Sequence, residues 1–89
     1  MIIDQGSDIP PYRQIATYLR EQILSGKIAP RQQLPSIRTL TQEYGVARTT
    51  AHKALRALVN DGLARVEKGW GVFVLPEGDR PKSQGPKAS

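Results

Sequence analysis

Residues 44–58 read YGVARTTAHKALRAL, and this stretch holds the expected end of one helix and the start of another. Gly45 is suited to end a helix, because glycine adopts the left-handed conformation found just beyond helix C-termini without strain. Only Val46 and Ala47 separate that glycine from a second helix expected at 48–60. Two helices joined by a turn of about three residues that includes glycine are typical of a helix-turn-helix. The stretch therefore predicts that this motif forms the centre of the fold.

The helix expected at 48–60 has two opposed faces when its residues are projected at about 100° each. One face is small and apolar, which suits close packing on other helices, and the other is basic and carries a hydroxyl. A solvated amphipathic helix has the same division, so the pattern alone leaves that interpretation open. The apolar face consists of Ala51, Ala54, Leu55 and Leu58, and the basic face consists of Arg48, Thr49, His52, Lys53 and Arg56.

The basic face has the chemistry that a DNA groove requires. The major groove of B-DNA is about 12 Å wide and accepts one helix. Arginine offers paired donors that match guanine O6 and N7, and threonine offers a hydroxyl and a methyl group. Lys53 and Arg56, farther along the helix, are expected to reach phosphates. The unpaired N–H groups at the start of a helix also favour phosphate, so the face as a whole indicates a phosphate-rich partner.

The formal net charge of the chain is +5, and its distribution supports the same partner. Residues 1–30 hold three basic and three acidic side chains, whereas residues 45–75 hold five basic and two acidic ones. A localised basic surface is the expected footprint of nucleic acid, although many small proteins are mildly basic.

The composition argues against several other classes of protein. The chain has no cysteine, so neither a disulfide scaffold nor a thiolate metal site is expected. It has one histidine, no phosphate-cradling glycine loop and no ligand set at metal spacing, so we expect neither an enzyme nor a metal or other cofactor. No signal peptide and no apolar run near about 18 residues is visible. We therefore expect a cytoplasmic protein with no membrane partner.

Two further helices are expected upstream of residue 48. A first helix is expected between Pro11 and Gly26, because apolar residues recur there at every fourth position. Ser36 is suited to cap a second helix, which Gly45 ends. Residues 1–9 are expected to be a flexible N-terminus. The apolar stripes are Ile15, Leu19 and Ile23 in the first helix and Ile37, Leu40 and Tyr44 in the second.

A β-hairpin is expected after the third helix. Short strand-like runs at 63–67 and 72–75 flank a glycine-bearing turn at 68–71. Trp70 lies in that turn, and two interpretations stay open: its ring packs back onto the core, or the tip approaches the DNA minor groove or backbone.

The predicted fold class is mainly α (α+β), a three-helix winged helix-turn-helix with a C-terminal two-stranded β-hairpin as the wing. The domain is expected to occupy residues 10–75. Residues 76–89 are rich in Pro, Gly, Lys and Ser and are expected to be a disordered tail or linker.

Residues 10–74 resemble the DNA-binding domain of the GntR family of bacterial transcription regulators. The most specific matches are LPSIRTL at 34–40, YGVARTTAHKALRAL at 44–58, DGL at 61–63 and KGWGVFV at 68–74. The resemblance implies DNA contacts from the PSxR element, from the start of the third helix and from the wing glycine, and more weakly from the tyrosine before the first helix. The candidate DNA-contact residues, from the resemblance and the charge pattern together, are Tyr12, Ser36, Arg38, Arg48, Thr49, Thr50, His52, Lys53, Arg56, Lys68, Gly69 and Trp70.

The chain departs from the family pattern in three places. Ala47 replaces the usual Ser or Thr, so a helix cap worth about 1 kcal/mol is missing. His52 stands where arginine is common, and this exchange is expected to change base preference unless His52 is a plain surface residue. Arg38 has the alternative of an ion pair with Glu43 or Asp61. Family members usually carry a C-terminal effector domain, and none is expected here, so the chain is either a stand-alone domain or the N-terminal part of a longer regulator.

The resulting hypothesis is sequence-specific binding of double-stranded DNA by a bacterial transcription regulator that acts as a repressor by occlusion. Helix 48–60 is expected in the major groove and the wing, 67–72, at the minor groove. The family implies a homodimer on a palindromic operator, which for this chain is weak or DNA-induced. The alternative is a winged-helix module whose basic face binds an acidic protein.

Overall fold

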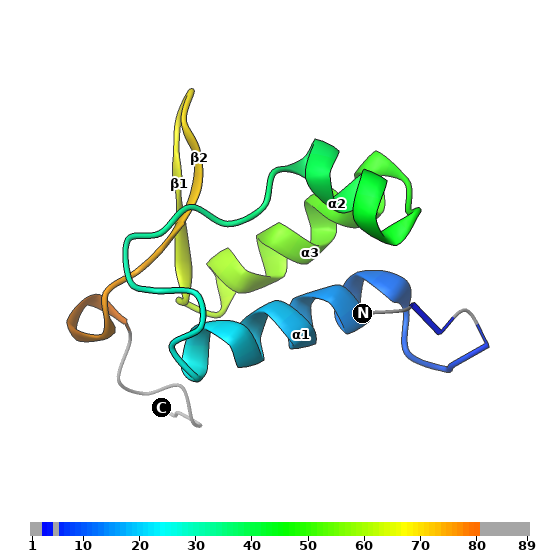
Figure 1. The fold of residues 1–89 in the computed structure, drawn as a ribbon, viewed down its shortest axis with the longest axis horizontal. Helices are drawn as coiled ribbons and strands as arrows, with labels where there is room; N and C mark the ends of the chain where they lie inside the picture. The colour runs from blue at the N-terminus through cyan, green and yellow to red at the C-terminus, as the bar shows by residue number, and fades with distance from the viewer. Residues whose placement is uncertain (1–2, 5, 81–89) are drawn as a thin grey trace.

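The computed structural model describes residues 3–4 and 6–80, and within them three α-helices precede a two-stranded antiparallel sheet (Figure 1). The predicted three-helix winged helix-turn-helix is thereby confirmed. The first strand begins one residue later than predicted, and the second is shifted by one residue toward the N-terminus. The elements are α1 at Pro11–Leu24, α2 at Ile37–Tyr44, α3 at Arg48–Asn60, β1 at Ala64–Glu67 and β2 at Gly71–Val74.

The core lies where α1 and α2 pack on α3. The apolar stripe of α1 is fully buried, as its spacing predicts, and so is the alanine-rich face of α3. Small side chains at Ala51 and Ala54 let the neighbouring helices approach α3 closely. Burial of one large side chain such as Leu58, at 0% exposure, contributes about 1.5–3 kcal/mol to folding. The packing fixes which face of α3 is left to solvent.

The turn between α2 and α3 is set by local signals at each helix end. The Ser36 hydroxyl accepts a hydrogen bond from the Thr39 N–H at 3.1 Å and so caps α2. Gly45 ends α2 with φ at 65°, in the left-handed region that glycine adopts most easily. Ala47 occupies the N-cap of α3 and provides no capping side chain. All three features agree with the sequence predictions.

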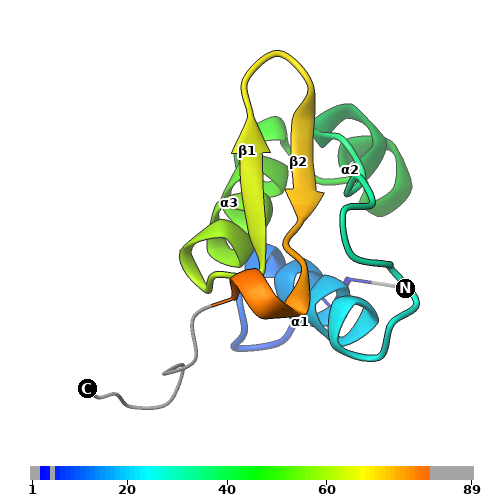
Figure 2. The ribbon, with the colours of Figure 1, turned by 90° about the vertical axis from the view of Figure 1, so that its left-hand side faces the viewer.

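The wing is a short hairpin in which Ala64 pairs with Val74 and Glu67 pairs with Gly71. Figure 2 shows the hairpin extending past α2, with its turn at the free end. The segment 31–34, which lies between α1 and α2, runs beside β2 and forms a bridge between Gln33 and Phe73. Three backbone hydrogen bonds of 2.8–2.9 Å accompany the bridge. The wing is therefore held along β2 by a third segment.

Both ends of the described chain have local structure. Near the N-terminus, the Asp4 N–H donates to Gln14 Oε1 at 2.8 Å. Near the C-terminus, Glu77–Asp79 forms a 3-10 helix, and Arg80 Nε donates to the Leu75 carbonyl at 3.1 Å. The first residues of the stretch expected to be a disordered tail thus have a defined conformation, and the rest, 81–89, lies outside the described residues. The domain limits stay a prediction. No helix in the described part of the chain has the length and apolar character needed to cross a membrane.

The two helix starts offer a paired test of capping. Ser36→Ala should lower the free energy of unfolding by about 1 kcal/mol, because it removes the cap on the Thr39 N–H. Ala47→Ser should raise it by a similar amount, because it adds a hydroxyl at the uncapped start of α3. Urea unfolding of the 89-residue chain measures both changes. Equal stability of Ala47→Ser and the parent chain would contradict the assignment of an uncapped α3.

Candidate nucleic-acid interface

The solvent face of α3 carries the basic residues that the sequence predicts. Arg48, Thr49, His52, Lys53 and Arg56 are all exposed, whereas the predicted apolar face of the same helix, Ala51, Ala54, Leu55 and Leu58, is buried. The predicted division of the helix into two faces is confirmed. The remaining candidate on α3, Thr50, is half-buried and lies at the border between the two faces.

The start of α3 leaves backbone donors available for a ligand. Ala51 is the first residue of α3 whose N–H bonds to a carbonyl of the helix start, that of Ala47. The N–H groups of Arg48, Thr49 and Thr50 precede this bond and have no capping side chain. Such groups favour an anion such as phosphate, and they lie next to the exposed Arg48 side chain.

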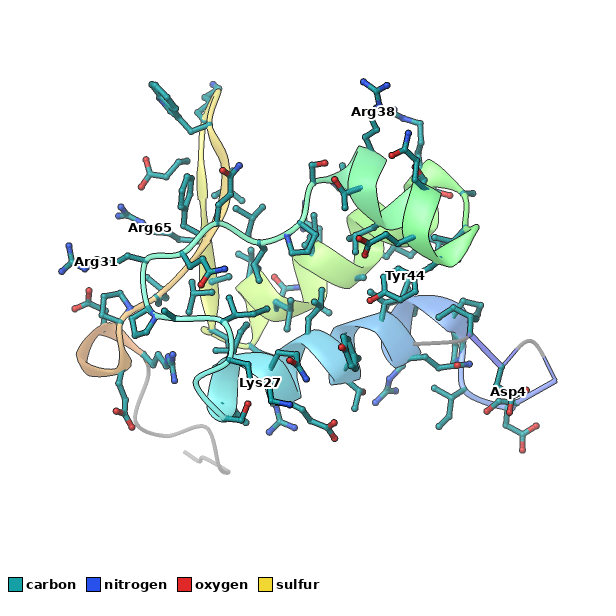
Figure 3. All side chains as sticks on the ribbon, in the orientation of Figure 1. Asp4, Lys27, Arg31, Arg38, Tyr44 and Arg65 are labelled. Carbon is teal, nitrogen blue, oxygen red and sulfur yellow. The ribbon has the colours of Figure 1, made fainter. Side chains whose placement is uncertain are left out.

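An open hollow beside α2 gathers four of the candidate residues. It is lined by Arg48, Thr49, His52 and Lys53 of α3 and by Ile37 of α2. Arg38, on the same helix as Ile37, is exposed. Figure 3 shows Arg38 projecting from α2 on the side of the molecule toward which the hairpin extends.

Tyr12 and Lys53 lie against each other across α1 and α3. Lys53 Nζ lies 5.7 Å from the centre of the Tyr12 ring, which is cation–π distance. Tyr12 is half-buried at the start of α1 and lines a second hollow with His52, Lys53 and Arg56. The weakest sequence candidate is thus brought next to the basic face, where its ring restrains the Lys53 side chain. No motif in the sequence signals this pairing.

Ser36 differs from the other candidates because its hydroxyl is already engaged. It accepts from the Thr39 N–H and donates to Thr39 Oγ1 at 3.0 Å. The residue is exposed, yet in this structure its hydroxyl serves to cap α2. Its candidate role in DNA contact remains a prediction.

The wing tip presents its three candidates to solvent. Lys68 and Gly69 are exposed in the turn, and Gly69 has φ at 84°. The Trp70 side chain is 76% exposed, so the interpretation that its ring packs onto the core is wrong for this structure. Trp70 instead lines an open hollow on the wing with Arg65 and Phe73.

The cations of the interface are not neutralised within the protein. In the described ranges 3–4 and 6–80, the salt bridge found joins Arg65 and Glu67 of β1, and none involves the α2, α3 or wing-tip candidates. Arg38 therefore makes no ion pair with Glu43 or Asp61, which was its alternative role. Cations without partners in the protein remain available to phosphate.

Tyr44 is an ionisable side chain outside the set of interface candidates. Partial burial, helped by Glu43 and Tyr18, raises the pKa of the Tyr44 hydroxyl. Tyr44 packs against the core and is not among the interface candidates. The residues that the structure describes contain no group of three or more His, Cys, Asp or Glu side chains placed to hold a metal ion.

Several known proteins are similar to this chain in sequence or in fold. The transcriptional repressor NagR of Bacillus subtilis is 43% identical over 74 residues, which cover 83% of this chain and 30% of NagR. The chain spans less than a third of the length of such curated relatives. Among solved structures, YtrA of Sulfolobus acidocaldarius, described as a GntR-family transcription factor, has a TM-score of 0.78 and 39% identity, covering 84% of this chain and 79% of YtrA.

The DNA-binding domain of AraR, crystallised with its operator ORX1, has a TM-score of 0.77 and 37% identity, covering 83% of this chain and 94% of that domain. The family model described as bacterial regulatory proteins, gntR family, matches residues 11–74, from the start of α1 to the end of β2. Fold, exposed basic helix and family model thus coincide over the same residues, and the chain belongs to the GntR family of bacterial transcription regulators, whose winged helix-turn-helix DNA-binding domain it carries.

Proposed function

We propose that this chain binds a specific double-stranded DNA operator and represses transcription by occluding it. The observation that carries the proposal is the unpaired basic face of α3, which adjoins the uncapped start of the same helix. A helix of this kind fits the major groove, where side chains at its start reach base edges. Arg48 and Thr49 take that position in α3, and His52 follows one turn later.

Contacts to phosphate and contacts to bases are expected from different residues. Lys53 and Arg56 lie farther along α3, beside the start of α1, where they suit the DNA backbone. Arg38 follows Ile37, which lines a hollow with Arg48 and Lys53, and adds a further exposed cation. Phosphate contacts fix the register of the helix, whereas Arg48 and His52 carry the sequence preference.

The wing is proposed to add a contact at the minor groove. Its tip bears Lys68 and Gly69, and the bare glycine backbone permits close approach to the sugar–phosphate chain. Figure 3 shows that Arg38 and the free end of the hairpin lie on the same side of the molecule. The proposed duplex therefore lies on this side of the molecule, where it contacts both α3 and the wing.

The named relatives support the regulatory part of the proposal. NagR is described as a repressor, and the AraR domain was crystallised on an operator. We extend both properties to this chain, together with a cytoplasmic location and a homodimer on a palindromic operator. An acidic protein is the alternative partner for the basic face.

Two substitutions separate base recognition from charge. Arg48→Ala should lose about 1–3 kcal/mol of discrimination between the best duplex and a scrambled one, because bidentate base contacts carry specificity. Lys53→Ala should weaken both duplexes alike and reduce the salt slope of log K by about one. Fluorescence anisotropy with duplexes selected from a random pool, at three salt concentrations, measures both effects.

Lys27→Ala is the matched control for these two variants. It removes the same charge from an exposed site at the C-terminal end of α1, which Figure 3 shows on the opposite side of the molecule from Arg38. Its affinity and salt slope should equal those of the parent chain. Two results would instead favour the protein-binding alternative. In one, the parent chain binds selected and scrambled duplexes equally; in the other, it retains an acidic protein but no duplex.

The proposed symmetry of the operator predicts a specific stoichiometry. Selected duplexes should contain an inverted repeat, because two copies related by a two-fold axis read identical half-sites. Sedimentation of the complex should give two chains on the full duplex and one on a duplex that holds a single half-site. A single asymmetric site bound by one chain would contradict the dimeric arrangement.

A further inference from the structure

The wing tip needs support beyond its own two strands. Each strand has only four residues, and an isolated two-stranded hairpin is marginally stable in water. The 31–34 segment supplies backbone support: the Arg31 N–H donates to the Val74 carbonyl, the Val74 N–H to the Gln32 carbonyl, and the Leu34 N–H to the Val72 carbonyl. These bonds hold β2 as far as Val72 but leave the turn itself without a backbone partner in that segment.

The Gln33 side chain continues this support into the turn. Its Nε2 donates to the Trp70 carbonyl at 2.7 Å, although the two residues are 37 positions apart in the sequence. The Trp70 N–H, in turn, donates to the Glu67 carbonyl at 2.8 Å and closes the turn. Gln33 thus contacts the backbone at the tip itself.

Gly71 shows how closely the amide is seated. A Cβ atom at position 71 would overlap Gln33 Nε2, and φ of Gly71 is 124°, a conformation that residues with a side chain rarely adopt. The amide of Gln33 therefore occupies the space that a side chain at position 71 would fill. Two separate features of the wing, a glycine and an exposed carbonyl, accommodate the same side chain.

The chain on the other side of Gln33 is firmly anchored. Leu34 is 2% exposed and belongs to the core, and Ser36 begins α2 by capping it. A short path therefore connects the wing tip to the core and to the helix-turn-helix: Trp70, Gln33, Leu34 and Ser36.

We propose that Gln33 is a positioning residue that holds the wing tip at a fixed place relative to α3, so that Lys68 and Gly69 engage DNA while α3 lies in the major groove. This inference rests on the proposed function, because it assigns Gln33 a part in DNA binding without a contact of its own. Loss of the amide leaves the tip free to move. DNA binding must then order the tip, and the conformational entropy lost in doing so weakens the binding.

The test uses Gln33→Met, which keeps the length of the side chain but removes the amide donor. Affinity for the selected duplex should fall about two- to tenfold, the range expected for one hydrogen bond. In a Lys68→Ala background the same substitution should have a smaller effect, because a tip that has lost its charged contact gains less from being held. In the free chain, the heteronuclear NOE of Gly69 and Trp70 should fall.

Gln32→Met is the matched control. Gln32 is the adjacent glutamine, and its Oε1 accepts from the Ala29 N–H at 3.0 Å within the loop. In Gln32→Met the heteronuclear NOE of Gly69 and Trp70 should equal that of the parent chain. Lys68→Ala should weaken DNA binding by the same factor in Gln32→Met as in the parent chain. Amide NMR spectra of both variants show whether each variant is folded.

The inference is overturned if Gln33→Met binds as Gln32→Met does, if its effect is the same with and without Lys68, or if the NOE at the tip is unchanged. In each of these cases the parent chain still prefers its selected duplex, and the proposed function stands. A parent chain with no such preference overturns the proposed function itself, and the NOE comparison still shows whether Gln33 orders the tip.

Discussion

The packing of the small-residue face of α3 on α1 and α2 is the constraint on which the rest of the structure depends. Ala51, Ala54 and Leu58 are fully buried there. Because an α-helix turns by about 100° per residue, burying that face fixes the direction of every other side chain on the helix. Arg48, His52 and Lys53 are exposed for this reason, and together they form a basic surface.

Charge and helix-end chemistry reinforce each other on this surface. A capping side chain at residue 47 would occupy backbone donors that a phosphate could otherwise use, and Ala47 leaves them open. The same choice lowers the stability of α3 by about 1 kcal/mol, so stability and anion binding are in opposition at this one position. The nearby contact between Lys53 and Tyr12 limits how far that lysine can move and connects α1 to the interface.

Local signals in the sequence predict most of the fold, because helices depend on neighbouring residues. The apolar spacing of Ile15, Leu19 and Ile23, and the turn residues Ser36 and Gly45, correctly place α1 and α2. Five of the six candidate residues of α3 are exposed and Thr50 is half-buried, whereas their roles on DNA stay predictions. The family resemblance contributes Arg38 and Gly69, which charge and spacing alone do not distinguish.

The wing is where prediction from sequence ends, because its contacts are non-local. Gln33 and Trp70 are 37 positions apart, and no local pattern indicates that they touch. Arg31 adopts φ at 70° although it is not glycine, so no residue type signals the bend that brings 31–34 alongside β2. The most direct measurement is an amide NMR titration of the 89-residue chain with a selected duplex. Shifts should change at Arg48–Lys53 and at Gly69 while Ile23 stays constant, and unchanged shifts at Arg48–Lys53 in a duplex-saturated sample would contradict the assignment of α3 as the DNA-reading helix.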